Sequence, residues 1–394
     1  MTQSSKDIAD LLSGKRILIA IFIGLAFSVW MVVSALFDVT FEKVEEGQGN
    51  YKHIESSEKF DKTDESQFEL KEGGDYVKHT YEDALKNVDW TFYSGLWLFL
   101  AVLMMGVRDL AYMIRIRILT DKRLSWKQSF FVIMIWEFAS ALSPGVVGGA
   151  AVAMFILARE KIEMGRATAI VVITALMDNL FYVVMTPLVF IFISNADLFP
   201  SGEGASFLSA NTQTIFWLGF LIILAVCTIL FISVFFYPRL IKIIIITIFK
   251  LPFLRRWKRN ALQTGNDVVV TSKELRGKPK SYWLYAFGAT VMSWVARYLV
   301  INFILMAFVQ IGFLENVLIF GKQLVMWLIM LVSPTPGGSG IAEVIFADLL
   351  GNFVASSLLI SALAILWRLI SYFPYLFLGF IIFPRWLRMT KKKN

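Results

Sequence analysis

Long apolar stretches separated by short polar segments follow one another along almost the whole chain. An apolar helix needs about 20 residues to cross the hydrocarbon core of a bilayer. Six stretches reach that length, at residues 17–37, 91–114, 168–193, 214–236, 282–309 and 354–383. The pattern therefore predicts an all-α polytopic membrane protein with six full transmembrane helices.

Two further apolar regions, residues 129–157 and 314–350, are each interrupted near the middle by proline and glycine. The residues concerned are Pro144, Gly145, Gly148 and Gly149 in the first region, and Pro334, Pro336, Gly337 and Gly338 in the second. Proline removes an amide hydrogen and glycine permits positive φ, so neither region can form one straight helix. We expect two re-entrant helical hairpins.

Composition agrees with a membrane protein. Hydrophobic residues make up 57% of the chain and charged residues only 17%, whereas a soluble domain carries about 25% charged residues. A single Cys excludes a disulfide framework, and both His residues lie in the polar segment 38–89. We therefore expect no metal site and no cofactor.

The distribution of Lys and Arg predicts the orientation. Most of these residues lie before residue 17, in 115–127, 159–166 and 239–280, and after residue 383. Because Lys and Arg concentrate on the cytoplasmic side, both termini should be cytoplasmic, in a bacterial inner membrane. Hairpin 129–157 should then enter from the cytoplasm and hairpin 314–350 from the outside, with inverted orientation.

Five parts of the chain follow from this orientation. They are a cytoplasmic N-terminus (1–16), a first transmembrane helix (17–37), an acidic extracytoplasmic loop (38–89), the main membrane domain (90–383) and a basic cytoplasmic tail (384–394). The acidic segment is interpreted as a solvated loop in preference to a binding cap. The basic stretch 239–280 is explained by membrane orientation, so a nucleic-acid partner is not expected. The expected partners are membrane lipids, and homo-oligomerisation stays open.

Ionisable residues also occur inside the apolar regions. They are Arg108, Asp109, Glu137, Asp178, Arg297, Lys322, Glu343, Asp348 and Arg368. Each is expensive in lipid, so they should pair, reach the interface or line a wet cavity. Arg368 is the first candidate for a phosphate contact, because arginine binds phosphate through a planar two-pronged group. A purely structural pair of Arg368 with Glu343 is an equal alternative.

Three other deep residues are candidates for the same cavity. Arg297 is a second candidate phosphate contact. Asp178 and Glu137 would neutralise an arginine or carry a coupled proton, and the pairing role is favoured. Paired, interrupted helices in the two halves of a membrane protein are the best sequence pointer to a transporter's substrate site.

The sequences SPTPGGSGIAEVIFADLL (333–350), ILWRLISYFPYLFLG (365–379) and SPGVVGGAAVAMFILAREKIEMGRATA (143–169) resemble the lysylphosphatidylglycerol synthase transmembrane-region family. The similarity spans about residues 96–383. It implies a flippase-like domain whose two re-entrant hairpins enclose a headgroup cavity. The site residues carried over by position are Pro336, Gly337, Gly338, Glu343 and Arg368, followed by Pro144, Gly148 and Asp178.

The function expected from these features is that of a lipid transporter of flippase type. It would move an anionic, aminoacylated or polyprenyl-phosphate lipid between leaflets. No aminoacyl-transferase domain follows the membrane part, so synthase activity is not expected and the protein is interpreted as a non-enzyme. The alternative is a membrane-embedded enzyme, or a module associated with a glycosyltransferase, acting on a lipid phosphate.

Overall fold

The computed structural model describes most of the membrane part and a small segment before it. The described residues are 39–54, 60, 64–80, 86, 90–142, 147–199, 212–237, 239–240, 243, 247, 266, 269–331, 335, 338, 340–354 and 356–391. The expected first transmembrane helix and most of the basic stretch 239–280 lie outside them. So do Pro144, Pro336 and Gly337.

The first half of the membrane part contains six described helices. They are α4 (Phe92–Leu119), α5 (Trp126–Leu142), α6 (Val147–Arg159), α7 (Met164–Phe192), α8 (Asn195–Leu198) and α10 (Thr212–Phe235). Thr91 caps α4 by accepting a hydrogen bond from the amide of Ser94, which satisfies a donor left free at the helix start. The α7 helix packs on α6 and α10.

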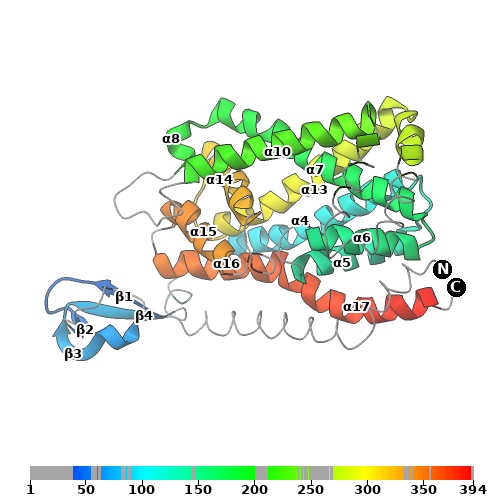
Figure 1. The fold of residues 1–394 in the computed structure, drawn as a ribbon. Coiled ribbons are helices and arrows are strands. Elements are labelled where there is room, and N and C mark those ends of the chain that lie inside the picture. The colour runs from blue at the N-terminus through cyan, green and yellow to red at the C-terminus, as the bar shows by residue number, and fades with distance from the viewer. Residues whose placement is uncertain are drawn as a thin grey trace.

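The second half contains five described helices and one short 3-10 turn. They are α13 (Lys280–Met306), α14 (Phe313–Met330), α15 (Ile341–Leu350), η3 (Gly351–Phe353), α16 (Ser357–Ser371) and α17 (Phe373–Lys391). The most extensive helix contact joins α4 to α13, and α5 packs on α17. Helices far apart in sequence therefore form one bundle (Figure 1).

Six of the described helices are long and apolar enough to cross a membrane. Five of them correspond to predicted crossings: α4, α7, α10, α13 and the α16–α17 pair. The sixth is α14, which the sequence assigned to a hairpin. The protein is therefore a multi-pass membrane protein built mainly of helices.

Two predicted helix boundaries differ from the structure. The α4 helix continues to Leu119 and so includes Arg115, which the charge pattern had placed in a cytoplasmic segment. The predicted crossing 354–383 is divided at Tyr372, where α16 ends and α17 begins. Pro374 is the second residue of α17 and has no amide hydrogen to donate back to α16, which favours a break at this point.

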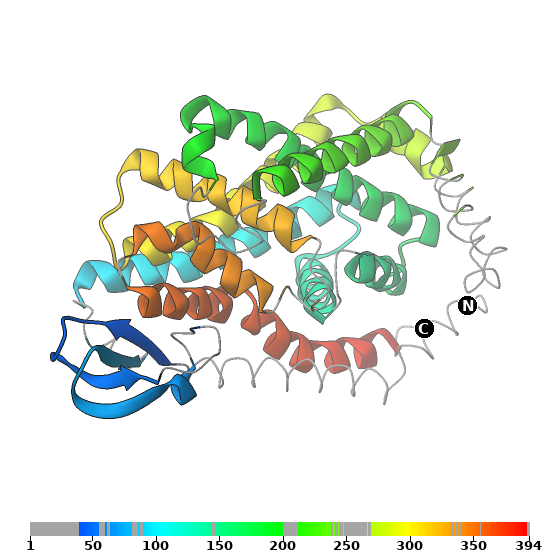
Figure 2. The same ribbon diagram turned by 60° about the vertical axis from the view of Figure 1, so that its left-hand side comes forward.

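Both predicted interruptions separate two helices. The first lies between Leu142 of α5 and Val147 of α6, and the second between Met330 of α14 and Ile341 of α15. In the second, Gly338 and Gly340 have φ of +70° and +84°, a conformation that side chains with a Cβ rarely adopt. The α5–α6 pair lies toward the end of the bundle where α17 finishes, and α14–α16 lie toward the other end (Figures 1 and 2).

The acidic segment 38–89, interpreted from its sequence as a small, soluble, partly ordered loop, contains a β-sheet that the sequence did not predict. Strands β1 (Val39–Lys43), β2 (Gly49–His53), β3 (Phe68–Gly74) and β4 (Tyr76–Thr80) form an antiparallel sheet in the order β1-β4-β2-β3. Phe41 and Phe68 stack at 4.0 Å between ring centroids and are both buried. This sheet lies beyond the end of the bundle at which α4 and α16 begin (Figure 2). The strands carry charged residues, such as Glu42 and Lys43 in β1 and Lys71 and Glu72 in β3, so the composition of the segment did not indicate an aromatic core.

Candidate functional site

A cavity of about 390 Å³ lies within the bundle, between the two interruptions. Helices α4, α5, α6, α7, α13, α14, α16 and α17 all contribute to its wall. Its charged lining residues are Arg115, Glu137, Asp178, Arg297 and Arg368. Ser140 and Ala141 lie beside the first interruption, and Thr335 and Gly338 belong to the second. Elements from both halves of the sequence thus meet around a charged chamber.

Asp178, in the middle of α7, joins three helices. Its Oδ1 accepts hydrogen bonds from Arg115 Nη1 of α4 at 2.5 Å and from Trp294 Nε1 of α13 at 2.9 Å. Arg115 also donates to the hydroxyl of Thr290. The Arg115 side chain is 8% exposed and that of Asp178 is 26% exposed. The pair is therefore anchored at the arginine and open to the cavity at the carboxylate.

Arg368 connects α16 to the start of α15. Its Nε donates to Glu343 Oε1 at 2.8 Å, and Glu343 Oε2 accepts from the amide of Gly340 at 2.7 Å. The guanidinium also lies 4.2 Å from the centre of the Tyr372 ring. Glu343 therefore caps α15 and pairs with an arginine from the next helix. Glu343 is not itself in the cavity wall, whereas Arg368 is.

A third group surrounds Arg108, whose side chain is 1% exposed. Arg108 donates to Asp109 Oδ1 at 3.1 Å and forms a close ion pair with Glu137 of α5. The hydroxyl of Tyr375 lies 2.8 Å and 2.9 Å from the two carboxylate oxygens of Asp109. Arg108 is thus buried in local pairs and does not extend to the interface. One arginine serves two carboxylates in this group.

Arg297 differs from the other arginines of the cavity. It is half-buried and its guanidinium lies 5.4 Å from the centre of the Trp294 ring. Within the part of the chain that the structure describes, no carboxylate forms an ion pair with Arg297. Its charge is therefore available to a ligand in the cavity.

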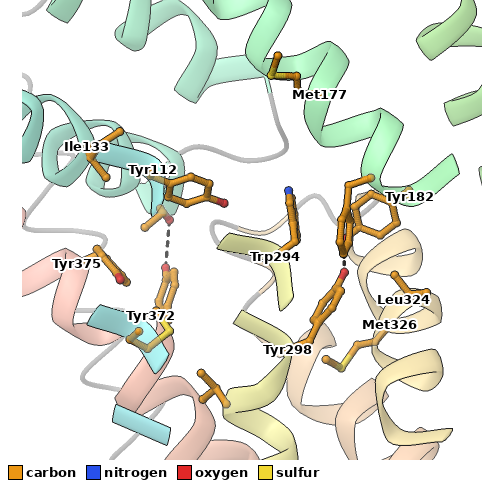
Figure 3. Close-up of a cluster of buried hydrophobic side chains, with 14 of the residues drawn as sticks. Tyr112, Ile133, Met177, Tyr182, Trp294, Tyr298, Leu324, Met326, Tyr372 and Tyr375 are labelled. Carbon is orange, nitrogen blue, oxygen red and sulfur yellow. Dashed lines mark hydrogen bonds between the residues drawn. The ribbon is translucent and has the colours of Figure 1, made fainter. Parts of the chain in front are cut away.

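Aromatic residues fill the space around these groups (Figure 3). The hydroxyls of Tyr182 and Tyr298 are hydrogen-bonded to each other, and Tyr182 stacks on Trp327 at 3.9 Å. The Tyr372 hydroxyl donates to the carbonyl of Ala141 at 3.1 Å, which ties the α16–α17 junction to the first interruption. Figure 3 shows both hydroxyl bonds, with Trp294 between them.

Most of the described candidate residues come together. Gly338, Asp178, Arg297, Glu137 and Arg368 all line the cavity, and Glu343 is bound to Arg368. Gly148 belongs to α6, two residues before the cavity residue Ala150. Their role in substrate binding stays a prediction.

Sequence reasoning missed Arg115, and it assigned Arg108 no role at the site. A signal was present, because Arg108, Tyr112 and Arg115 are spaced at i, i+4 and i+7 and so share one helix face. This face was missed because the predicted helix ended at residue 114, one residue before Arg115, whereas α4 continues to Leu119.

Among the described residues, no group of three or more His, Cys, Asp and Glu side chains is gathered. Four of the carboxylates inside the apolar regions, Asp109, Glu137, Asp178 and Glu343, form ion pairs with arginines. Arg115, Arg108 and Arg368 each hold at least one of them.

Comparison with known proteins places the membrane part in a family. Residues 80–379 match the family described as Lysylphosphatidylglycerol synthase TM region. A UPF0104 membrane protein from Archaeoglobus fulgidus is 26% identical over 313 residues, which are 75% of this chain and 87% of that protein. No solved structure gives a significant match. The family match covers well over half of the chain and includes the whole cavity, so the chain belongs to the lysylphosphatidylglycerol synthase transmembrane-region family.

Proposed function

We propose that the protein is a lipid transporter of flippase type, which moves a phosphate-bearing lipid between the two leaflets. The headgroup would enter the charged cavity while the acyl chains stay in the bilayer. The observation that carries the proposal is a cavity walled by three arginines, one of which, Arg297, has no ion-pair partner among the described residues.

The chemistry of the cavity supports a phosphate-bearing headgroup. Arginine binds phosphate with two parallel hydrogen bonds, and it stays charged at any accessible pH. The volume of about 390 Å³ lies within the range of small-ligand sites, about 300–1,000 Å³. The family takes its description from a synthase of an aminoacylated phospholipid, which also favours a lipid substrate.

The arrangement of the interrupted helices supports a route between leaflets. We propose that α5–α6 and α14–α15 are re-entrant hairpins that enter from opposite faces, with both termini in the cytoplasm. Irregular backbone at membrane depth is tolerated where it is buried in protein or lines a wet cavity. Both interruptions adjoin the same cavity through Ala141 and Gly338. A bacterial inner membrane stays our prediction for the location.

Reconstitution tests this function. The purified protein is placed in vesicles containing fluorescent phosphatidylglycerol, and a membrane-impermeant quencher then reports how much of the probe is in the outer leaflet. We expect quenching to exceed the half seen in protein-free vesicles, because the probe moves outward during the assay. Arg297→Gln should abolish this movement.

The matched control is Arg388→Gln, which removes an arginine that is exposed near the end of α17. It should transport as the unaltered protein does. Absence of movement for phosphatidylglycerol, an aminoacylated lipid and a polyprenyl phosphate alike would contradict the proposal. Catalytic conversion of any of these lipids would instead favour the membrane-enzyme alternative.

A further inference from the structure

The charges around the cavity are distributed unevenly. Arg115 is bound to Asp178, and Arg368 is bound to Glu343. Arg108, however, is shared by Asp109 and Glu137. One carboxylate of the Asp109–Glu137 pair therefore has no arginine of its own.

Arg297 lies in the wall of the same cavity as Glu137 of this group. No ion pair joins Arg297 to a carboxylate among the described residues. The described groups bonded to Asp109 and Glu137 are Arg108, which both carboxylates share, and the hydroxyl of Tyr375, which donates to Asp109. On neighbouring α16, Arg368 is occupied by Glu343. Arg297 is thus the cavity arginine without an ion-pair partner among the described residues, and its positive charge faces the same cavity as Glu137.

We propose that an anionic headgroup binding at Arg297 is accompanied by the uptake of one proton by the Asp109–Glu137 pair. This inference rests on the proposed function. A phosphate bound at Arg297 would neutralise the positive charge that, in the empty cavity, balances the second carboxylate of the Asp109–Glu137 pair. That carboxylate would then lack a counter-charge in a poorly hydrated site. Such a group is neutralised by protonation at far lower cost than it is kept charged.

The charges balance in this step. The proton comes from water and binds a carboxylate oxygen, while the headgroup contributes one negative charge. The loaded cavity then has the same net charge as the empty one. Movement of a singly charged lipid together with one proton would be electrically neutral, and a pH gradient across the membrane would drive it.

Calorimetry on the detergent-solubilised full chain tests the linkage. The probe is dioctanoylphosphatidylglycerol, whose phosphodiester keeps one negative charge between pH 5 and 8. Binding is measured in buffers of different ionisation enthalpy, which counts the protons taken up. We expect about one proton per lipid, and an affinity that weakens by up to about tenfold per pH unit as pH rises.

Three variants locate the proton. Asp109→Asn or Glu137→Gln should bind the probe with an affinity independent of pH, close to that of the unaltered protein at low pH. Tyr375→Phe removes a donor to the ionised carboxylate, so the pH dependence should move to higher pH. Glu163→Gln changes an exposed carboxylate before α7 that makes no capping hydrogen bond, and it should leave the pH dependence unchanged.

The outcomes separate this inference from the proposed function. Tight binding that is lost in Arg297→Gln, but that takes up no proton at any pH, would refute the linkage and leave the lipid site intact. A pH dependence that persists in both Asp109→Asn and Glu137→Gln would refute it as well. Absence of binding at every pH would overturn the lipid site and the linkage together.

Discussion

Replacing Arg368 by Met, alone and together with Glu343→Gln, tests whether this arginine only holds the second interruption or also binds a headgroup. In the structure it does the first: its Nε donates to Glu343 Oε1 at 2.8 Å. A structural role and a binding role predict different results for the double variant. If Arg368 only balances the charge of Glu343, removing both charges should restore stability and transport together. If Arg368 also binds a headgroup, transport should stay lost.

The size of the effect follows from burial. The two side chains are 5% and 20% exposed, and breaking a buried pair by removing one partner costs about 3–5 kcal/mol. Glu343 opens partly to water and keeps its bond from the Gly340 amide, so Arg368→Met should cost toward the lower limit, about 3 kcal/mol. The double variant should recover at least about 1 kcal/mol, because the uncharged amide introduced by Glu343→Gln needs no cation and still accepts from the Gly340 amide.

Two measurements on four proteins make the test: the unaltered protein, Arg368→Met, Glu343→Gln and the double variant. Unfolding in detergent gives the coupling free energy between residues 343 and 368, and probe movement in vesicles gives transport. We expect the double variant to regain stability without regaining transport. Arg388→Met, on the exposed face of α17, controls for the loss of an arginine. If the double variant regains transport in step with stability, Arg368 is a structural residue, and the headgroup contact falls to Arg297 alone.

Three further changes test other parts of the structure. A Cβ at Gly379 would collide with the Phe138 ring, so Gly379→Ala should lower stability in detergent by about 1–3 kcal/mol. Gly106→Ala is the control, because a Cβ at Gly106 would have nothing within 4 Å, and it should leave stability unchanged. Equal effects of the two changes would mean that α5 and α17 do not pack this closely. Burial acts to raise the pKa of Asp121, but hydrogen bonds from Lys278 and Arg166 outweigh it and hold the pKa below its usual value. The ionised Asp121 therefore stabilises the folded protein above the unfolded pKa of about 3.9, and this stabilisation is lost as pH falls through the folded pKa. Asp121→Asn should therefore melt lower at pH 7 and lose less stability than the unaltered protein between pH 5 and pH 2, and parallel melting curves would count against the pairing. In a Cys227→Ser background, cysteines at Glu163 and Lys273 should react with an impermeant reagent only from the cytoplasmic side and one at Ala196 only from the outside, and the opposite pattern would reverse the orientation.

Helix positions and the two interruptions were predictable because they depend on local sequence. A run of about 20 apolar residues predicts a membrane-spanning helix, and a pair such as Gly337-Gly338 predicts a break in a helix, without reference to the rest of the chain. The small sheet was not predicted, because its core comes from single aromatic residues, such as Phe41 and Phe68, spread over four short charged strands. The end of α4 was missed because Arg115 looks like a boundary residue until its partner Asp178 is known.

The sequence alone determined that this is a multi-pass helical membrane protein with interrupted helices in both halves and costly charges inside the apolar regions. It could name Arg368, Glu343, Asp178 and Arg297, because any ionisable residue at membrane depth needs a reason to be there. Only the tertiary structure decided which charges neutralise each other. Pairing depends on side chains such as Arg115 and Asp178, 63 residues apart, and such contacts are set by helix packing and not by local pattern. For that reason the structure, and not the sequence, leaves Arg297 as the arginine most open to a ligand.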